Sequence, residues 1–266
     1  MRPRPPCPIA AVAVLLLAGC DGPNTAPTVD APGRETTAKS KVLEAGAMVM
    51  QDRTPVDQIH MYVCGLHFYN GDMTRQVEAH HYCIQSNEDF NQCLIFSGNG
   101  EDAKLIGIEY IISARLFEGL PEDERKFWHS HDYEVKSGQL IAPGLPAAAE
   151  HALMEKFVTT YGKTIHTWQV DRGDTLPLGA PQLMMGFTAD GQADPAKVRD
   201  RDRRFDVSTE ENRKARSDIP EPRLAAGVNA WEKGQVVQLE WKSTDETRGY
   251  SRPSSVPGEP HQQATR

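Results

Sequence analysis

Short segments in which apolar and polar residues alternate recur along the chain, and this is the pattern of half-buried β-strands. We expect strands over residues 60–69, 76–85, 90–96, 105–113, 133–141, 164–170 and 182–188. The polar residues 86–89 (SNED) separate the second and third segments and predict a hairpin there. Residues 105–113 (LIGIEYIIS) form the most apolar segment, so we expect them at the centre of the sheet.

Other segments have helical spacing instead. Residues 38–52 carry apolar side chains on one side of a helix: Val42, Leu43, Ala45, Met48 and Val49. A helix that lies on a membrane usually has a polar side rich in Lys and Arg, and this one does not, so we favour an ordinary amphipathic helix. Further helices are expected at 115–120, 121–128, 147–161, 195–204 and 209–217, the last two on the surface.

The order of these elements predicts the fold class. Strands are grouped around short helices without regular β-α-β alternation, which indicates an α+β fold. We therefore expect a single domain with an antiparallel or mixed sheet and flanking short helices.

The first twenty residues have the features of a bacterial lipoprotein signal. Arg2 and Arg4 precede an apolar run at 9–17, which is too short to span a membrane. The run ends in residues 17–20 (LAGC), which resemble a lipobox and imply cleavage before Cys20 and acylation of its sulfur. The alternative is an ordinary secretory signal followed by an unmodified cysteine. We expect a bacterial envelope protein, anchored to a membrane by lipid and facing the periplasm.

Composition shifts divide the chain into four parts. We expect a signal peptide at 1–19, a lipidated Pro/Ala/Thr/Gly-rich linker at 20–37, a domain at 38–218 and a polar, largely disordered tail at 219–266. Within the tail, residues 235–241 have the pattern of an edge strand.

Overall composition narrows the function further. The 266 residues are 39% hydrophobic and 25% charged, which is ordinary for a globular protein. The formal net charge is −8, and phosphate binding needs a basic surface, so nucleic acid is not an expected partner.

Three of the five cysteines lie inside the expected domain: Cys64, Cys83 and Cys93. No C-x-x-C spacing is present, which argues against a zinc site built from thiolates. An exported protein can form disulfides, and Cys83 and Cys93 stand at similar distances from the predicted hairpin turn. They can therefore be disulfide partners or separately packed residues.

Long segments of the chain match a known family in order. KVLEAGAMVMQ, CGLHFYNGDMTRQVEAHHYC, LIGIEYIIS, LFEGLPEDERKFWHSHDYEVKSG and YGKTIHTWQVDRGDTLPLGAPQLMM, between residues 39 and 187, resemble the oil body-associated proteins of plant seeds and their fungal and bacterial relatives. Plant members are linked to oil-body structure, and the family has been described only as a domain of unknown function. The resemblance implies affinity for lipid or membrane surfaces, with a lipid as an expected ligand.

Histidines and carboxylates form the one group of residues whose chemistry is recognisable, that of a candidate metal site. His80 and His81 point to opposite faces of a strand, so only one of them can join a given site. Zinc or iron bound by that histidine, by His129 and His131, and by a carboxylate from Glu109 or Glu134 is chemically sensible. The alternative is that these histidines are buried and hydrogen-bonded without a metal.

Two further residues are candidates for structural or ligand-pocket roles. Trp128 ends a charged run and needs apolar cover, so we expect it to be a buried anchor. Arg172 lies in a predicted turn at 171–174, where it can pair with carboxylates or bind a ligand. A thiol nucleophile is not favoured, because no family signature surrounds Cys64 or Cys83.

These observations favour a lipid-anchored protein that binds or stabilises a lipid or envelope surface without catalysis. The alternative is a metal-binding protein or a metal-dependent enzyme that uses His129 and His131.

Overall fold

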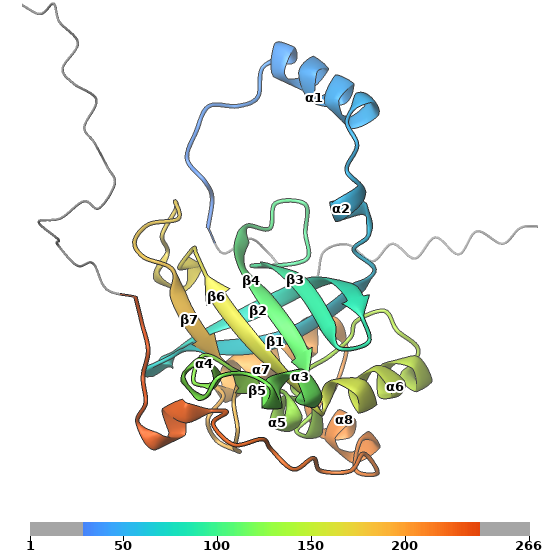
Figure 1. Cartoon of the computed structure of the whole chain (residues 1–266). Helices are drawn as coiled ribbons and strands as arrows, with labels where there is room; N and C mark the ends of the chain where they lie inside the picture. Colours follow the sequence, from blue (N-terminus) through green and yellow to red (C-terminus); the bar gives the residue numbers. More distant parts are fainter. Residues whose placement is uncertain (1–28, 240–266) are drawn as a thin grey trace, which may run out of the picture.

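The computed structural model describes residues 29–239, and its central feature is an antiparallel sheet that closes on itself (Figure 1). The strands are β1 (Met61–Tyr69), β2 (Asp72–Asn87), β3 (Phe90–Phe96), β4 (Leu105–Ser113), β5 (His129–Ser130), β6 (Thr160–His166) and β7 (Gln182–Met185). Their order is β4-β3-β2-β1-β7-β6-β5, and an additional pairing of β4 with β6 closes six of them into a barrel. The expected α+β class with an antiparallel sheet is confirmed, and the closed barrel is more specific than that expectation.

Short helices surround the barrel in the described part of the chain. They are α1 (Ala38–Met50), α2 (Thr54–Asp57), α3 (Ala114–Glu118), α4 (Glu122–Arg125), α5 (Asp132–Lys136), α6 (Ala147–Phe157), α7 (Pro195–Phe205), α8 (Thr209–Ala215) and the 3-10 turns η1 (Val170–Arg172) and η2 (Ala230–Lys233). No helix among residues 29–239 is long and apolar enough to cross a membrane.

One part of the barrel wall is made by an inserted segment, residues 129–141. Strand β7 pairs with β1 only at Phe68 and Tyr69, so a gap remains between β1 and β6 beyond it. In this gap β5 pairs with β6 at His129↔Gly162, and Ile141 forms a β-bridge with Cys64 of β1. The inserted segment therefore brings side chains into the barrel from the side.

The expected strand at 133–141 is wrong. Residues 132–136 form helix α5, and only Ile141 of the expected strand takes part in a β-bridge. Asp132 and Glu134 lie in the first turn of α5, where acidic side chains favour the helix dipole. Gly138, with φ of 80°, then reverses the chain. Elsewhere the boundaries differ: β2 is longer than expected, and β6 begins at residue 160 instead of 164.

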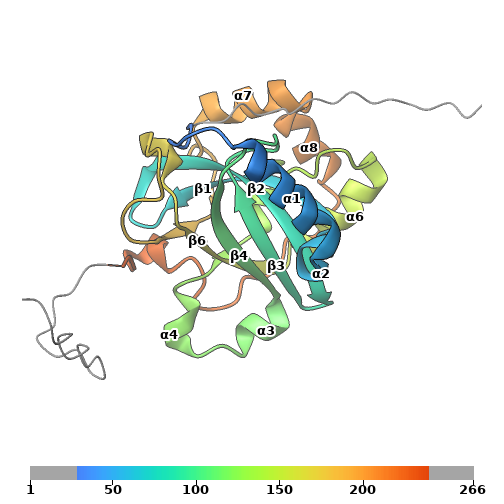
Figure 2. The same ribbon diagram turned by 90° about the horizontal axis from the view of Figure 1, so that it is seen from above.

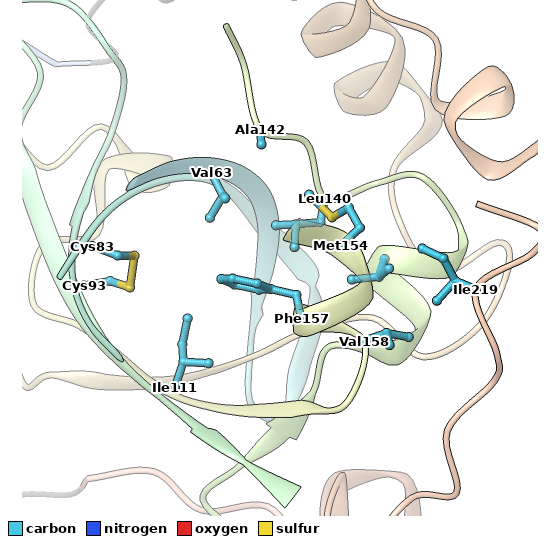
Figure 3. Packing of buried hydrophobic residues seen from close by; sticks show 11 residues of the cluster. Val63, Cys83, Cys93, Ile111, Leu140, Ala142, Met154, Phe157, Val158 and Ile219 are labelled. Carbon is cyan, nitrogen blue, oxygen red and sulfur yellow. A yellow bond between two sulfur atoms is a disulfide. The ribbon is translucent and has the colours of Figure 1, made fainter. Parts of the chain in front are cut away.

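Side chains that point into the barrel form three layers. An apolar layer at one end contains Val29, Tyr69, Val77, Ala79, Ile95, Ile106, Val170 and Met184. An apolar layer at the other end includes Val63, Cys83, Cys93, Ile111, Met154 and Phe157, with Phe157 reaching in from helix α6 (Figure 3). Between them lies a polar layer of histidines and glutamates, which is described below.

Cys83 and Cys93 face each other across β2 and β3 and form a disulfide in the second apolar layer (Figure 3). Of the two possibilities that the sequence leaves open, the structure has the disulfide and not two separately packed cysteines. Cys64 is a buried free thiol on β1.

Two helices expected on the surface carry fully buried arginines. Arg201 of α7 donates to the Gln139 carbonyl at 2.7 Å, and Arg216, after α8, donates to the carbonyls of Val135 and Leu140 at 2.8 and 2.9 Å. Since the acceptors lie between residues 135 and 140, both arginines hold the inserted segment in place.

The packed domain extends beyond the expected boundary at residue 218. Val228 and Ala230 are buried. The Asn229 side chain accepts a hydrogen bond from the backbone N–H of Ser130 (3.0 Å) and donates one to the Ser130 hydroxyl (2.9 Å). The Gln238 amide donates to the carbonyls of Asn70 and Leu183. Residues 235–239 form no strand, so that part of the expected edge strand is wrong. Residues 1–28 and 240–266, with the lipoprotein signal and the rest of the tail, lie outside the described residues.

Helix α1 forms as the spacing predicts, with Thr37 as its N-cap. None of its residues is buried, so its apolar side has no contact with the barrel core. Viewed from above, the helix lies in front of the barrel (Figure 2), and the side view shows that it stands away from the barrel (Figure 1).

Candidate metal centre

The polar layer of the barrel gathers five histidines and two glutamates. Four of these residues occupy inward positions of the barrel strands, and three come from the inserted segment. They are His67 (β1), His81 (β2), Glu109 (β4), His166 (β6), His129 (β5), His131 (the N-cap of α5) and Glu134 (α5). All seven side chains are buried.

Glu109 is the centre of this cluster. Its Oε2 atom lies 2.7 Å from His81 Nε2 and 3.8 Å from His67 Nε2, and its Oε1 atom lies 3.2 Å from His131 Nε2 and 3.4 Å from His129 Nε2. His166 extends the cluster, with its Nε2 atom 3.5 Å from His67 Nδ1. Four imidazole nitrogens therefore surround one carboxylate.

Hydrogen bonding accounts for only part of this arrangement. His131 has hydrogen-bond geometry toward Glu109, and His81 Nε2 is in close contact with Glu109 Oε2 at 2.7 Å. Both ring nitrogens of His129, Nδ1 of His81 and Nδ1 of His166 are buried without a hydrogen-bond partner among the described residues. Leaving a buried donor or acceptor unpaired costs about 1–3 kcal/mol for each group.

The separations fit donors that share an ion. Nitrogen and oxygen ligands about 2.1 Å from a tetrahedral metal are about 3.4 Å apart. The donors of His67, Glu109 and His129 all lie within 4.8 Å of one another, and so do those of His129, His131 and Glu134.

Glycines provide the space for these side chains. A methyl group on Gly162 would overlap the Glu109 carboxylate and lie 2.8 Å from His131 Nε2. On Gly186 it would lie 2.8 Å from Glu134 Oε2 and 2.9 Å from His129 Cδ2. Because Gly162 and Gly186 have no side chains, the barrel leaves space at these positions for the side chains of the inserted segment.

Burial sets the protonation of the cluster. It lowers the pKa of His129 and of His166 to about 3, so both rings are neutral near pH 7, the form that binds metals. Burial opposes ionisation of Glu109, but His81 and His131 hold its pKa well below the usual range. Burial, followed by the charges of Glu109 and Asp132, raises the pKa of Glu134 well above its usual value. These opposite pKa shifts favour Glu109 over Glu134 as the ionised carboxylate of the centre.

The remaining space in the cluster is small. A cavity of about 10 Å³ is lined by Val63, His67, His81, Glu109, Ile111, His131, Glu134, Leu140 and Phe157. A cavity of this size holds about one water-sized group. The site has no room for an organic substrate in this conformation.

Most of the metal ligands expected from the sequence meet in this cluster: His81, Glu109, His129, His131 and Glu134. His80 does not join them, because it points out of the barrel, as alternation requires. Its Nδ1 lies 2.8 Å from the Tyr62 hydroxyl and its Nε2 lies 3.0 Å from Glu78 Oε1.

His67 and His166 belong to the cluster and were not identified from the sequence. Each stands at an inward position of a strand, two residues before Tyr69 and two residues after Thr164. Strand alternation applied to every histidine would have placed both in the barrel, but only once the strand boundaries were known.

Trp128 and Arg172 lie away from the centre. Trp128 is buried among apolar residues that include Phe117, and its indole N–H donates to Glu124. Arg172 lies in η1, partly exposed, and pairs with Asp174. Gly173 follows with a φ of 77°, as its place in the expected turn requires.

A second group on the outside of the barrel also contains metal-capable side chains: Cys64, Glu78 and His80. Arg204 binds the Glu78 carboxylate with two nitrogens, at 3.2 and 2.5 Å. Because this cation already neutralises Glu78, the group is explained as an ion-pair network.

Comparisons with known proteins identify the family. Residues 53–220 match the family model described as "Protein of unknown function (DUF1264)". The chain is 44% identical to oil body-associated protein 1B of Arabidopsis thaliana over 80% of this chain and 89% of that protein. It is 46% identical to oil body-associated protein 1A of Zea mays over 79% of this chain and 90% of that protein. No solved structure matches. The chain therefore belongs to the oil body-associated protein family and contains the domain of unknown function DUF1264.

Proposed function

We propose that the barrel binds a transition-metal ion, zinc or iron, in the histidine and glutamate cluster. One observation carries this proposal: four histidine Nε2 atoms lie within 4 Å of a buried carboxylate, and that of His129 has no hydrogen bond among the described residues. A cation would bind these nitrogens and offset the cost of burying them unpaired.

His81, His129, His131 and Glu109 would hold the ion, with His67 next to them. Three or four neutral imidazoles and one carboxylate suit zinc or ferrous iron. His166 and Thr164 adjoin this set from β6 and are fully buried. Bound zinc would act as a Lewis acid and bound iron as a redox centre. The size of the cavity limits any further ligand to a water-sized molecule.

Metal content tests the proposal, and two adjacent histidines provide a matched pair of variants. The protein is purified without chelator or affinity tag, and its metal is quantified. We expect about one ion per chain in the wild type and in His80→Gln, and loss of the ion in His81→Gln, since Gln is a poor ligand for these metals. Wild-type protein without stoichiometric metal, which also binds none when zinc or ferrous iron is added, would overturn the proposal.

Association with a lipid surface is a second candidate function. The names of the relatives refer to oil bodies, and the lipobox-like residues 17–20 favour an anchor at Cys20. We propose that this chain is a lipid-anchored protein of a bacterial cell envelope, facing the periplasm. Two or three acyl chains would hold it stably at a membrane.

The anchor has a direct test. Cys20→Ala should release the protein from the membrane fraction or leave the unprocessed precursor. The intact mass of the wild type should include the acyl groups on Cys20. A wild-type mass without any acyl increment would exclude this candidate.

A further inference from the structure

We propose that one side of the molecule, formed by helix α1 and the loop between β6 and β7, lies against a phospholipid bilayer. This inference rests on the proposed acylation of Cys20 and adds the part of the folded domain that faces the lipid. We call this surface the α1 face.

The first observation is the exposure of α1, which replaces the sequence-based expectation that it is an ordinary amphipathic helix away from a membrane. Val42, Leu43, Val49 and Met50 share one side of the helix, at spacing i, i+1, i+7 and i+8. Val49 is 86% exposed and Met50 is 85% exposed, and no residue of the helix is buried. An exposed apolar helix side that packs against no other described part of the chain is unusual for a surface that faces only water.

The second observation is the position of the chain that precedes the domain. Val29 is buried in the apolar layer at one end of the barrel, with Tyr69 and Val170. Cys20 is nine residues upstream, so an anchor there would lie within about 30 Å of Val29 even if the chain were fully extended. The anchor would therefore hold this end of the barrel close to the bilayer.

The third observation is what else lies at this end. Helix α1 and the loops β3–β4 and β6–β7 project on the same side of the barrel, at the top of Figure 1. The β6–β7 loop exposes Leu176 and Leu178, and Leu105 is exposed at the start of β4. Three separate segments thus present apolar side chains where the anchor would be.

Residues 30–53, which include α1, have no net charge, and this favours contact with lipid through apolar side chains. Residues 30–53 contain four basic and four acidic residues, which cancel, whereas the whole chain has a net charge of −8. A neutral segment gains little from anionic lipids. Binding by the α1 face should therefore depend weakly on phosphatidylglycerol content and on salt.

The test places a fluorescent label at chosen positions of the full chain, purified from membranes and reconstituted in phosphatidylcholine vesicles with nitroxide-labelled lipid. Leu176→Cys and Leu145→Cys form a matched pair, because these leucines are 46% and 45% exposed. Leu145 stands two residues before helix α6, which lies away from the α1 face (Figure 1). Cys64 is fully buried, and Cys83 and Cys93 are bonded to each other, so the introduced thiol is labelled selectively among the described residues.

We expect the nitroxide lipid to quench a label at Leu43→Cys and at Leu176→Cys, and not at Leu145→Cys. Val42→Ser combined with Val49→Ser, made in the unacylated Cys20→Ala chain, should lower partitioning onto these vesicles at least about tenfold.

The outcomes separate this inference from the anchor. Protein that is acylated and membrane-bound, with equal quenching at positions 176 and 145, would overturn the α1 face and keep the anchor. Protein without acylation whose labels at 43 and 176 are still quenched would overturn the anchor and keep the face. Binding to triolein droplets without quenching on phospholipid vesicles would overturn the bilayer as the partner.

Discussion

At the residue scale, alternation explains which histidines enter the centre and which do not. His80 and His81 are adjacent, yet only His81 reaches Glu109, because successive strand side chains point to opposite faces. The sequence predicted that only one of the two could join a site, but it left open which one. The contribution of His67 and His166 could not, because it depends on the closure of strands distant in sequence, which no local pattern encodes.

Gly162 gives a prediction at this scale. Gly162→Ala should abolish metal binding and destabilise the fold by about 1–3 kcal/mol, because the methyl group overlaps the Glu109 carboxylate in a packed interior. Metal content and urea unfolding measure the two effects. Gly119→Ala is the control, since the nearest atom to its added methyl group is 3.4 Å away. Normal metal content in Gly162→Ala would contradict the assigned position of the centre.

The pH dependence of the metal-free protein is a second prediction. Burial holds the pKa values of His67, His129 and His166 below 6.5, so below that pH the unfolded chain binds protons that the folded chain does not. Glu134 offsets one of these protons above pH 4.5, because its pKa is raised in the fold. Stability should be greatest near pH 6.5, because it falls on acidification by about 1.4 kcal/mol per pH unit for each net proton, and the raised pKa of Glu134 lowers it again at higher pH. Urea unfolding at pH 7 and pH 5 checks this, and equal stabilities would contradict it.

At the element scale, strands were predicted well and their junctions less well. Segments 90–96 and 105–113 match β3 and β4 because their alternation is clear. Helix α5 was mistaken for a strand because Tyr133 and Val135 also fit alternation over so short a length. The inserted segment is positioned by Arg201 and Arg216, whose partners are far away in sequence.

Trp128 provides the prediction for this scale, because it lies between α4 and β5. Trp128→Ala should lower the free energy of unfolding by about 3–5 kcal/mol, the usual cost of truncating a buried aromatic residue. Trp128→Phe should lose less, since an aromatic ring stays beside Phe117 and only the bond to Glu124 and part of the buried ring volume are lost. Chemical denaturation measures both variants. A loss below about 1 kcal/mol in Trp128→Ala would show that the ring is not an anchor.

At the scale of the whole molecule, the α+β class was predictable and the closed barrel was not. Closure joins β4 to β6 through Gly107↔His166 and the residue pairs that follow, and these partners are more than 45 residues apart in sequence. The same applies to residues 219–239, whose polar composition suggests a tail. Their few apolar residues nevertheless pack against the barrel and its inserted segment.

Truncation tests this packing. A chain that ends at residue 218 loses the Asn229 bonds to Ser130 and the cover from Val228 and Trp231. We expect a loss of several kcal/mol, about 1–3 kcal/mol of it from the unpaired backbone N–H of Ser130. A chain that ends at residue 239 keeps all of these contacts and is the control. Equal melting temperatures for the two truncated chains would show that residues 219–239 do not stabilise the domain.

X-ray absorption of the purified, chelator-free protein tests the metal centre most directly. The structure predicts an ion with nitrogen and oxygen ligands at about 2.0–2.2 Å and the outer-shell scattering of several imidazoles. His80→Gln should give the same spectrum, and His81→Gln should lose the metal or change its ligands. An ion surrounded mainly by water or sulfur, or a spectrum unchanged by His81→Gln, would contradict a metal centre inside the barrel.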